Sequence, residues 1–377
     1  FTASAPGRLV RSTRGYWTFV PAPLPPRLDL GLAALEELSE ANLALGQLEG
    51  IGHRLPNPHL LIGPFLRREA VLSSRIEGTV ANAEDLLLFE AAPTEEPKSP
   101  DVREVSNYVK ALQHGLQRLH KLPVGLELIR ELHKVLTEGV RGGEKRPGEF
   151  RTTQNYIGRP GQPVSEARFV PPPPQEVGQA LQELEKFLQA KSPYPALINL
   201  ALIHYQFETI HPFVDGNGRV GRLLISLLLC DWKLLSQPVL YLSAFFERNR
   251  RPYSDLMLAV SKTGTWMDWI QFFLRGVAEQ SRDGVLRSKQ LLQLWEDYRS
   301  KVQMARASGH LLRIVDQLFE TPAMTIRQIQ KRLKVSYPTA EANIERLVAA
   351  GILVEHTGRL RNRIYVAPDI IRIIDAD

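Results

Sequence analysis

The segment HPFVDGNGRVGR, residues 211–222, carries the groups that phosphate chemistry needs. Gly216 and Gly218 let backbone N–H groups approach an anion closely. The helix expected to begin near Gly218 adds the positive end of its dipole. Arg219 and Arg222 lie three positions apart on that helix, so both guanidinium groups can bind phosphate oxygens. The turn therefore predicts a cradle for a phosphorylated ligand.

Two further side chains of this segment could act on that ligand. Asp215 precedes the turn, and a lone carboxylate beside phosphates is the ligand expected for Mg²⁺. His211 can take a proton from an incoming hydroxyl, so the segment predicts phosphoryl or nucleotidyl transfer. The alternative, a glycine-rich turn with a core histidine and surface arginines, does not explain why all of them gather in one segment. The sequence contains no G-x-x-x-x-G-K-[ST], which excludes a P-loop enzyme.

The elements around this segment are expected to be mainly helical. The apolar run LLISLLLC follows it directly and predicts a buried helix that holds the turn rigidly. Apolar residues at helical spacing recur from Leu28 to about Arg299. Residues 142–174 interrupt them with Gly, Pro and short β-type runs, which predicts a hairpin on a helical body. The first thirty residues are proline-rich and are expected to be irregular.

The C-terminal segment differs in style from the rest. HLLRIVDQLFE, TIRQIQKRLKV and SYPTAEANIERLVAAGILVEH read as three helices, and GRLRNRIYVA adds two short strands around a basic turn. This order predicts a winged helix-turn-helix domain. Its second helix-turn-helix element presents Glu341 and Glu345 against only Arg346, whereas a helix that reads DNA usually carries more positive charge. Dimerisation or partner docking is therefore favoured over nucleic-acid binding.

Composition places the chain among ordinary soluble proteins. It has 377 residues, 44% hydrophobic and 23% charged, which suggests more than one domain. The 47 basic and 41 acidic residues give a net charge of +6, which permits contact with a polyanion without requiring it. Cys230 is the only cysteine, so no intrachain disulfide forms and a cytoplasmic location is expected. The run LLISLLLCDWKLL is too short for a membrane span and includes Asp231 and Lys233.

Residues 211–222 resemble the Fic family motif HPFx[DE]GNGRxxR at every specified position. Fic proteins are helical enzymes, most of which transfer AMP from ATP to a hydroxyl of a target protein. The resemblance implies that His211 deprotonates a Ser, Thr or Tyr hydroxyl and that Asp215 holds Mg²⁺. It implies that Gly216, Asn217 and Gly218 form an anion hole. It also implies that Arg219 binds the β-phosphate region and that Arg222 binds the γ-phosphate. Related Doc kinases carry Lys at the place of Gly218, so the glycine favours AMP transfer over phosphate transfer.

The segment SSRIEG, residues 73–78, resembles the inhibitory helix of the same family, [ST]xxxE[GN]. Ser73 and Glu77 are four positions apart and would share one helix face. The resemblance implies that Glu77 pairs with Arg222, occupies the γ-phosphate position and holds ATP unproductively. The alternative is a surface glutamate on an amphipathic helix.

Two more segments resemble parts of Fic proteins. TTQNYIG, followed by FVPPPP, is similar to the flap that covers the active site and pairs with an extended target peptide. The flap candidates are Asn155, Tyr156, Ile157 and Gly158. Residues 241–256 are similar to the stretch that closes the nucleotide pocket. Asn249 and Tyr253 are candidate adenosine contacts there, with helix packing as the alternative.

The resemblance implies a fold, a division into domains and a function. The fold is a mainly α, Fic-type helical bundle with a β-hairpin flap and a C-terminal winged helix-turn-helix. The expected domains are an N-terminal region with the inhibitory helix, a catalytic domain and the winged helix, at residues 1–100, 101–300 and 301–377. The expected function is transfer of AMP to a target protein or to the chain itself, with Glu77 inhibiting and homodimers common in the family. Alternatives are a nucleotide-sensing DNA-binding regulator and an enzyme that removes AMP.

Overall fold

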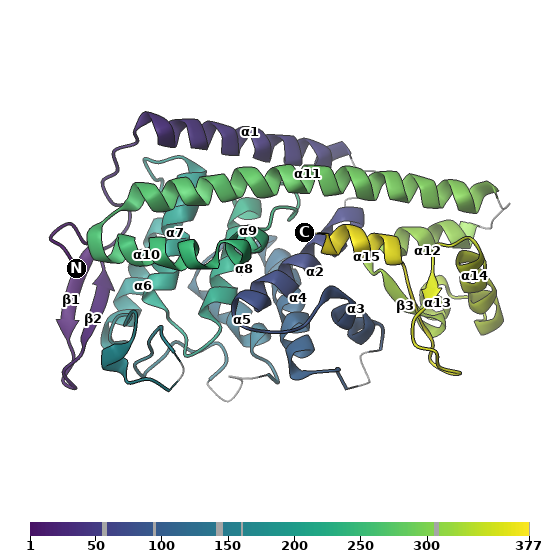
Figure 1. Cartoon of the computed structure of the whole chain (residues 1–377), viewed down its shortest axis with the longest axis horizontal. Helices are drawn as coiled ribbons and strands as arrows, with labels where there is room; N and C mark the ends of the chain where they lie inside the picture. Colours follow the sequence, from purple (N-terminus) through teal and green to yellow (C-terminus); the bar gives the residue numbers. More distant parts are fainter. Residues whose placement is uncertain (55–58, 93–95, 141–145, 160, 305–308, 377) are drawn as a thin grey trace. The chain divides into compact units, whose positions relative to one another are not determined.

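A computed structural model of the chain describes residues 1–54, 59–92, 96–140, 146–159, 161–304 and 309–376. The chain divides into two compact units, each assembled from separate segments (Figure 1). The motif unit comprises Phe1–Gly46, Lys110–Leu235 and Tyr241–Gln280. The winged-helix unit comprises Gln47–Val109, Ser236–Leu240 and Ser281–Asp377. Neither unit is contiguous in sequence.

The centre of the motif unit is a pair of helices that flank residues 211–216. They are α7 (Ala196–Ile210) and α8 (Asn217–Asp231), and each buries twelve of its fifteen residues. Helices that are buried on all sides belong to a core, as the apolar run after the motif predicted. The two helices approach closely at Gly221, where an added Cβ would lie 3.2 Å from the Phe207 ring. This close packing fixes the ends of the connection between them.

Other helices of the motif unit surround this pair (Figure 1). They are α5 (Leu126–Leu136), α6 (Pro174–Gln189), α9 (Ser243–Arg248) and α10 (Arg250–Thr263). Three long helices have residues in both units, namely α1 (Leu32–Arg54), α4 (Pro100–Leu119) and α11 (Trp266–Met304). Within the motif unit, the α11 residue Trp269 donates its indole N–H to the carbonyl of Ala201 at 3.0 Å. A buried indole thus finds its hydrogen-bond partner in the core helix.

The N-terminus forms a hairpin, so the prediction of an irregular start was wrong. Strands β1 (Gly7–Arg11) and β2 (Trp17–Pro21) pair antiparallel, with Gly7 opposite Pro21 and Arg11 opposite Trp17. Four consecutive residues of β2 are buried, and the N–H of Phe19 donates to the carbonyl of Val170 at 2.9 Å. Because both faces of β2 are covered, its sequence lacks the alternation that identifies a half-exposed strand.

The expected hairpin over residues 142–174 is reduced to a single pair in its described part. Ile157 and Phe169 form an isolated antiparallel bridge, with N–H to carbonyl distances of 2.9 and 3.1 Å. Between them lies a 3-10 turn, η1 (Val164–Glu166). The ladder is limited because this segment is rich in proline, which donates no backbone hydrogen bond.

The second unit contains the predicted winged helix-turn-helix. Its elements are α12 (Gly309–Glu320), β3 (Ala323–Thr325), α13 (Ile326–Leu333), α14 (Tyr337–Ala349), β4 (Val354–Glu355), β5 (Ile364–Val366) and α15 (Pro368–Asp375). The sheet is antiparallel in the order β3-β5-β4. Strand β3 and helix α15 add to the three helices and two strands expected from the sequence.

The same unit includes α2 (His59–Ile76) and α3 (Ala83–Ala91), which pack against the winged helix. Arg67 of α2 donates to the Glu90 carboxylate at 2.7 Å and to the carbonyls of Gly63 and Glu320 at 2.9 and 2.7 Å. A Cβ at Gly63 would lie 2.5 Å from the Glu320 carbonyl oxygen, so only glycine allows α2 and α12 to approach this closely. None of the helices in the described parts of the chain has the length and apolar character that a membrane span requires.

Candidate active site

His211 ends helix α7 in a conformation that side chains other than glycine rarely adopt. Its φ of 50° and ψ of 60° lie in the left-handed region, which costs about 1–2 kcal/mol for such a residue. The backbone N–H donates to the Phe207 carbonyl at 3.0 Å, and Nδ1 lies 3.2 Å from the Glu208 carbonyl oxygen. A proton on Nδ1 shared with that oxygen leaves the Nε2 lone pair as the basic position of the ring.

The turn from His211 to α8 is held by hydrogen bonds of its own residues. Gly216 adopts a φ of 76° and caps the start of α8, and its N–H donates to Oδ1 of Asp215 at 2.7 Å. The buried Asn217 side chain accepts from the Phe213 N–H at 2.8 Å and donates to the Phe213 carbonyl at 2.9 Å. The Asn217 amide therefore shapes the turn. The backbone N–H groups at the start of α8 are the groups that can donate to an anion.

Arg219 and Arg222 are both buried at the start of α8, with 4% and 2% of their surfaces exposed. Buried guanidinium groups at a helix N-terminus act strongly on neighbouring charges, because little water screens them. Their field acts on nearby groups. Burial and the positive charge of Arg222 together lower the pKa of His204 in α7 to about 3.

Arg151 supports the turn from outside the 211–222 segment, and the sequence analysis missed it. Its guanidinium donates to the carbonyls of His211 at 2.9 Å and Ile210 at 3.3 Å, and also to those of Pro172 at 2.6 Å and Thr153 at 3.2 Å. Burial lowers the pKa of Arg151 to about 10, so the group remains charged at neutral pH. No spacing in the sequence marks this arginine, because its carbonyl partners lie up to 60 residues away.

His133 of α5 is a second supporting residue that the sequence analysis missed. Its ring stacks on Phe213 with centroids 3.8 Å apart and planes 1° apart. Nδ1 accepts the N–H of Gly148 at 2.9 Å, and Nε2 lies 3.1 Å from the Asp215 carbonyl oxygen. Burial lowers the pKa of His133 to about 4, so the ring is neutral at physiological pH. The sequence shows only one histidine on the apolar face of an amphipathic helix, a pattern equally typical of packed core residues.

The first of the flap candidates also reaches this turn. Asn155 Nδ2 donates to the carbonyls of Phe213 and His211 at 2.8 and 3.2 Å. Ile157 is part of the bridge to Phe169, while Tyr156 is half-buried and Gly158 exposed on the same segment. The segment that begins at Gly148 is thus attached to the turn at several points.

Comparison with known proteins agrees with this geometry. Residues 35–117 match the Fic/DOC family N-terminal domain, and residues 123–229, which include His211 and the turn, match the Fic/DOC family domain. The chain belongs to the Fic/DOC family. Residues 309–354 match the winged helix-turn-helix DNA-binding domain.

Curated relatives and solved structures extend the comparison. The protein adenylyltransferase Fic of Drosophila grimshawi is 40% identical over 115 residues, which cover 29% of this chain and 21% of that protein. The Drosophila willistoni protein of the same name is 31% identical over 207 residues, 54% of this chain and 37% of that protein. The chain thus matches well under half the length of these relatives.

Two solved structures show the fold. A Fic family protein from Desulfovibrio desulfuricans aligns with a TM-score of 0.57 at 18% identity, covering 91% of this chain and 98% of that one. Fic-1 from C. elegans aligns with a TM-score of 0.53 at 20% identity, covering 69% of this chain and 74% of that one. The first alignment runs through nearly the whole of both Fic proteins.

Two residues expected near adenosine have packing roles in this Fic chain. Asn249 Nδ2 donates to the Phe245 carbonyl at 2.9 Å, between α9 and α10. Tyr253 is buried, its hydroxyl lies 2.7 Å from His204 Nε2, and its ring stacks on Phe246 with centroids 4.4 Å apart. These contacts are the ones that the helix-packing alternative describes.

The two residues of the SSRIEG segment belong to the winged-helix unit. Ser73 is fully buried in α2, whereas Glu77 is exposed in the turn after Ile76, the last residue of the helix. The Glu77 N–H donates to the Ser74 carbonyl at 3.0 Å. Gly78 has a φ of 93°, which explains why glycine follows the glutamate at the end of this helix. Ser73 therefore lies within the helix, whereas Glu77 lies one residue beyond its end, so the two do not share a face of the helix.

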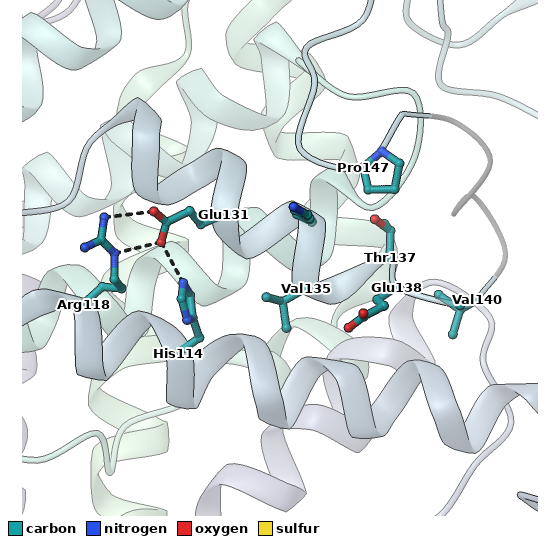
Figure 2. Close-up of a pocket in the computed structure, with 10 residues that line it drawn as sticks. His114, Arg118, Glu131, Val135, Thr137, Glu138, Val140 and Pro147 are labelled. Atoms are coloured by element: carbon teal, nitrogen blue, oxygen red, sulfur yellow. Dashed lines mark hydrogen bonds and ion pairs between the residues drawn. The ribbon is translucent and has the colours of Figure 1, made fainter.

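A cavity of about 770 Å³ lies on another face of α5 (Figure 2). The Glu131 carboxylate accepts hydrogen bonds there from His114 at 2.7 Å and from Arg118 at 2.8 and 2.9 Å. The described residues that line it are His114, Arg118, Glu131, Lys134, Val135, Thr137, Glu138, Gly139, Val140 and Pro147. None of these belongs to the Fic motif, and Arg118 and Glu131 neutralise each other, so this cavity is not the candidate nucleotide site.

Proposed function

We propose that this chain transfers AMP from ATP to a hydroxyl side chain of a target protein, with itself as one possible target. The proposal rests on one observation: His211, held in a left-handed conformation, and the buried Arg219 and Arg222 at the start of α8 lie at the two ends of one short turn. The name of the Drosophila relatives, protein adenylyltransferase, supports the same reaction.

The proposed reaction assigns His211 as the base. Its Nε2 takes the proton of a Ser, Thr or Tyr hydroxyl while Nδ1 stays hydrogen-bonded to the Glu208 carbonyl. The hydroxyl oxygen attacks the α-phosphorus, a phosphate ester forms, and the bond to pyrophosphate breaks. Backbone N–H groups at residues 216–218 and the side chains of Arg219 and Arg222 stabilise the negative charge on the phosphates.

Asp215 is the proposed ligand for Mg²⁺. Its carboxylate is half-buried beside the turn, and hard oxygen donors are what Mg²⁺ requires. In the described parts of the chain, no three His, Cys, Asp or Glu side chains cluster as a metal site. The ion would therefore be held jointly by Asp215 and the phosphate oxygens, where it would neutralise part of their charge.

Glu77 is the proposed inhibitor of this reaction. It is an exposed carboxylate at the end of a helix whose Ser-x-x-x-Glu-Gly ending resembles the inhibitory helix of the family. Paired with Arg222, it would occupy the γ-phosphate position and leave ATP in an unproductive pose. The flap residues Asn155 to Gly158 would pair with the target peptide as an added strand.

The winged helix is proposed as a dimerisation or docking element of a cytoplasmic enzyme. The wing carries Arg359, Arg361 and Arg363. Arg363 pairs with Glu341 of α14 at 2.9 Å, which neutralises one of the three. A surface that binds nucleic acid depends on uncompensated positive charge. This ion pair lowers the positive charge of the wing and therefore favours docking over nucleic-acid binding.

The proposal is tested by transfer of label from α-³²P ATP with Mg²⁺, with self-labelling as the readout. The proteins compared are wild type, Glu77→Gly, and Glu77→Gly combined with His211→Ala. Strong labelling of the single variant alone is expected. Label from γ-³²P ATP would instead indicate phosphate transfer. Nucleotide binding without labelling in any protein would overturn the proposal and favour nucleotide sensing or AMP removal.

A further inference from the structure

His133 joins two segments of the motif unit that are far apart in sequence. Its ring is buried between Gly148, the first residue of the segment 148–158 that carries the flap candidates (the flap segment), and the turn at Phe213 and Asp215. Three of its contacts are specific, namely one accepted hydrogen bond, one donated hydrogen bond and a parallel stack on Phe213. A histidine that only fills space needs none of these.

The hydrogen bonds fix which ring nitrogen carries the proton. The Gly148 N–H donates to Nδ1 at 2.9 Å, so Nδ1 must present its lone pair. Nε2 then carries the proton and donates it to the Asp215 carbonyl oxygen at 3.1 Å. The ring therefore acts as a directional connector, with an acceptor facing the flap segment and a donor facing the turn.

The donated bond controls the orientation of the next peptide group. In a trans peptide, the carbonyl of Asp215 and the N–H of Gly216 point in opposite directions. Because His133 holds that carbonyl, the Gly216 N–H points to the other side, where it donates to Asp215 Oδ1 at 2.7 Å. One hydrogen bond from His133 thus reaches the Asp215 carboxylate through a single rigid plane.

We propose that His133 is a positioning residue that orients the Asp215–Gly216 peptide, and with it the Asp215 carboxylate, which is the proposed Mg²⁺ ligand. The inference rests on the proposed function for the meaning of that orientation. It adds to that function a residue outside the motif that sets the geometry of the turn. The Nε2 donor is the essential group, and Nδ1 attaches the ring to the flap segment.

Two amide substitutions separate the two nitrogens. In His133→Gln, the side-chain amide extends to about the Nε2 position and can still donate to the Asp215 carbonyl. In His133→Asn, the shorter amide reaches only the Nδ1 position and can accept from Gly148. His133→Phe keeps the stack on Phe213 and removes both hydrogen bonds. His120, an exposed histidine after α4, provides matched control variants His120→Gln and His120→Asn.

Each variant is made in the Glu77→Gly background, and kcat and KM for ATP are measured with the thermal unfolding midpoint. His133→Gln is expected to keep kcat within about threefold, whereas His133→Asn and His133→Phe lose about tenfold or more, as expected for a lost oriented hydrogen bond. The His120 variants should match their parent. The proposal would be overturned if His133→Gln and His133→Asn lost kcat equally and in step with their unfolding midpoints. It would also be overturned if His133→Asn kept more activity than His133→Gln.

Hydrogen exchange of residues 211–218 in the nucleotide-free protein decides the question independently of activity. The Gly216 amide hydrogen is expected to exchange slowly in the parent and in His133→Gln, and faster in His133→Asn and His133→Phe. If the Glu77→Gly parent transfers no AMP, the proposed function fails while this exchange order still tests His133. Unchanged exchange in all variants would overturn the positioning role.

Discussion

At the scale of single residues, the turn of the Fic motif is shaped by side chains that hold its backbone carbonyls. Arg151, Asn155 and His133 all lie outside the motif, yet they bond to the carbonyls of His211, Phe213 and Asp215. These bonds hold His211 in its left-handed conformation, which the isolated segment would not favour. The residues that would do chemistry are therefore only part of the site.

Replacement of Arg151 by Met is expected to destabilise the chain by about 3 kcal/mol, because it removes the donor to the carbonyls of Pro172 and Ile210 in buried surroundings. If the turn loses its shape, AMP transfer should fall by at least as much as it falls in His211→Ala. Urea unfolding and labelling in the Glu77→Gly background measure both effects. Arg168→Met, at an exposed arginine of the same segment, is the control. A fully stable Arg151→Met protein would contradict the structural role.

At the scale of elements, helix α7 meets α8 through a histidine that must stay neutral. Burial, and then the charge of Arg222, lower the pKa of His204 from its ordinary 6.5 to about 3. Below pH 6.5 the unfolded chain takes up a proton at His204 that the folded chain does not. The free energy of unfolding should therefore fall as the pH decreases, with the loss continuing towards pH 3.

Between pH 7.5 and pH 5, His204 alone should reduce the free energy of unfolding by about 2 kcal/mol. His204 stacks on the aromatic rings of Phe246 and Trp269, so His204→Phe keeps an aromatic ring there and is expected to remove this part of the pH dependence. Urea unfolding at the two pH values checks it. The exposed His120→Phe control should keep the dependence, and an unchanged slope in His204→Phe would disprove the assignment.

The end of α2 offers a second prediction at this scale. Gly78 has a φ of 93°, which Asn tolerates and a β-branched residue does not. Gly78→Val should displace the neighbouring Glu77 and raise self-labelling of the otherwise wild-type chain, whereas Gly78→Asn should leave it inhibited. Gly50→Val, in a helix and with open space around it, is the control. Equal labelling by the Val and Asn variants would show that the turn does not set the position of Glu77.

Sequence patterns predicted those elements whose signal is local. The apolar runs of α7 and α8 and the helix order of the winged domain depend on residues a few positions apart, and the structure contains them. The hairpin of β1 and β2 was missed because β2 is covered on both faces. His133 and Arg151 were missed because their partners Asp215 and His211 lie 82 and 60 positions away. Contacts of that separation leave no periodic pattern in a single sequence.

At the scale of the whole molecule, the helix that precedes Glu77 belongs to the same compact unit as the winged helix. Arg67 of α2 joins the Glu90 carboxylate to the Glu320 carbonyl at the end of α12, and its side chain is almost completely buried. Leu87 and Ala91 of α3 share a hydrophobic cluster with Ala323, Ile364 and Val366 of the small sheet. The winged helix is therefore a structural support of the proposed inhibitory segment, whatever else it binds.

Loss of this support should weaken inhibition. Arg67→Met removes three hydrogen bonds of α2 and is expected to reduce the free energy of unfolding by about 3 kcal/mol, since the half-buried Glu90 carboxylate and the Glu320 carbonyl lose their donor and a buried side chain is replaced. Because α2 then holds Glu77 less firmly, self-labelling with α-³²P ATP should rise in the otherwise wild-type chain. The same substitution combined with Glu77→Gly should give no further rise, because the inhibitor is already absent. Lys98→Gln, which removes an exposed ion pair to Asp85 in the same unit, should change neither quantity. An increase of equal size with and without Glu77 would show that Arg67 acts on the catalytic site by another route, and the winged helix would then have no part in inhibition.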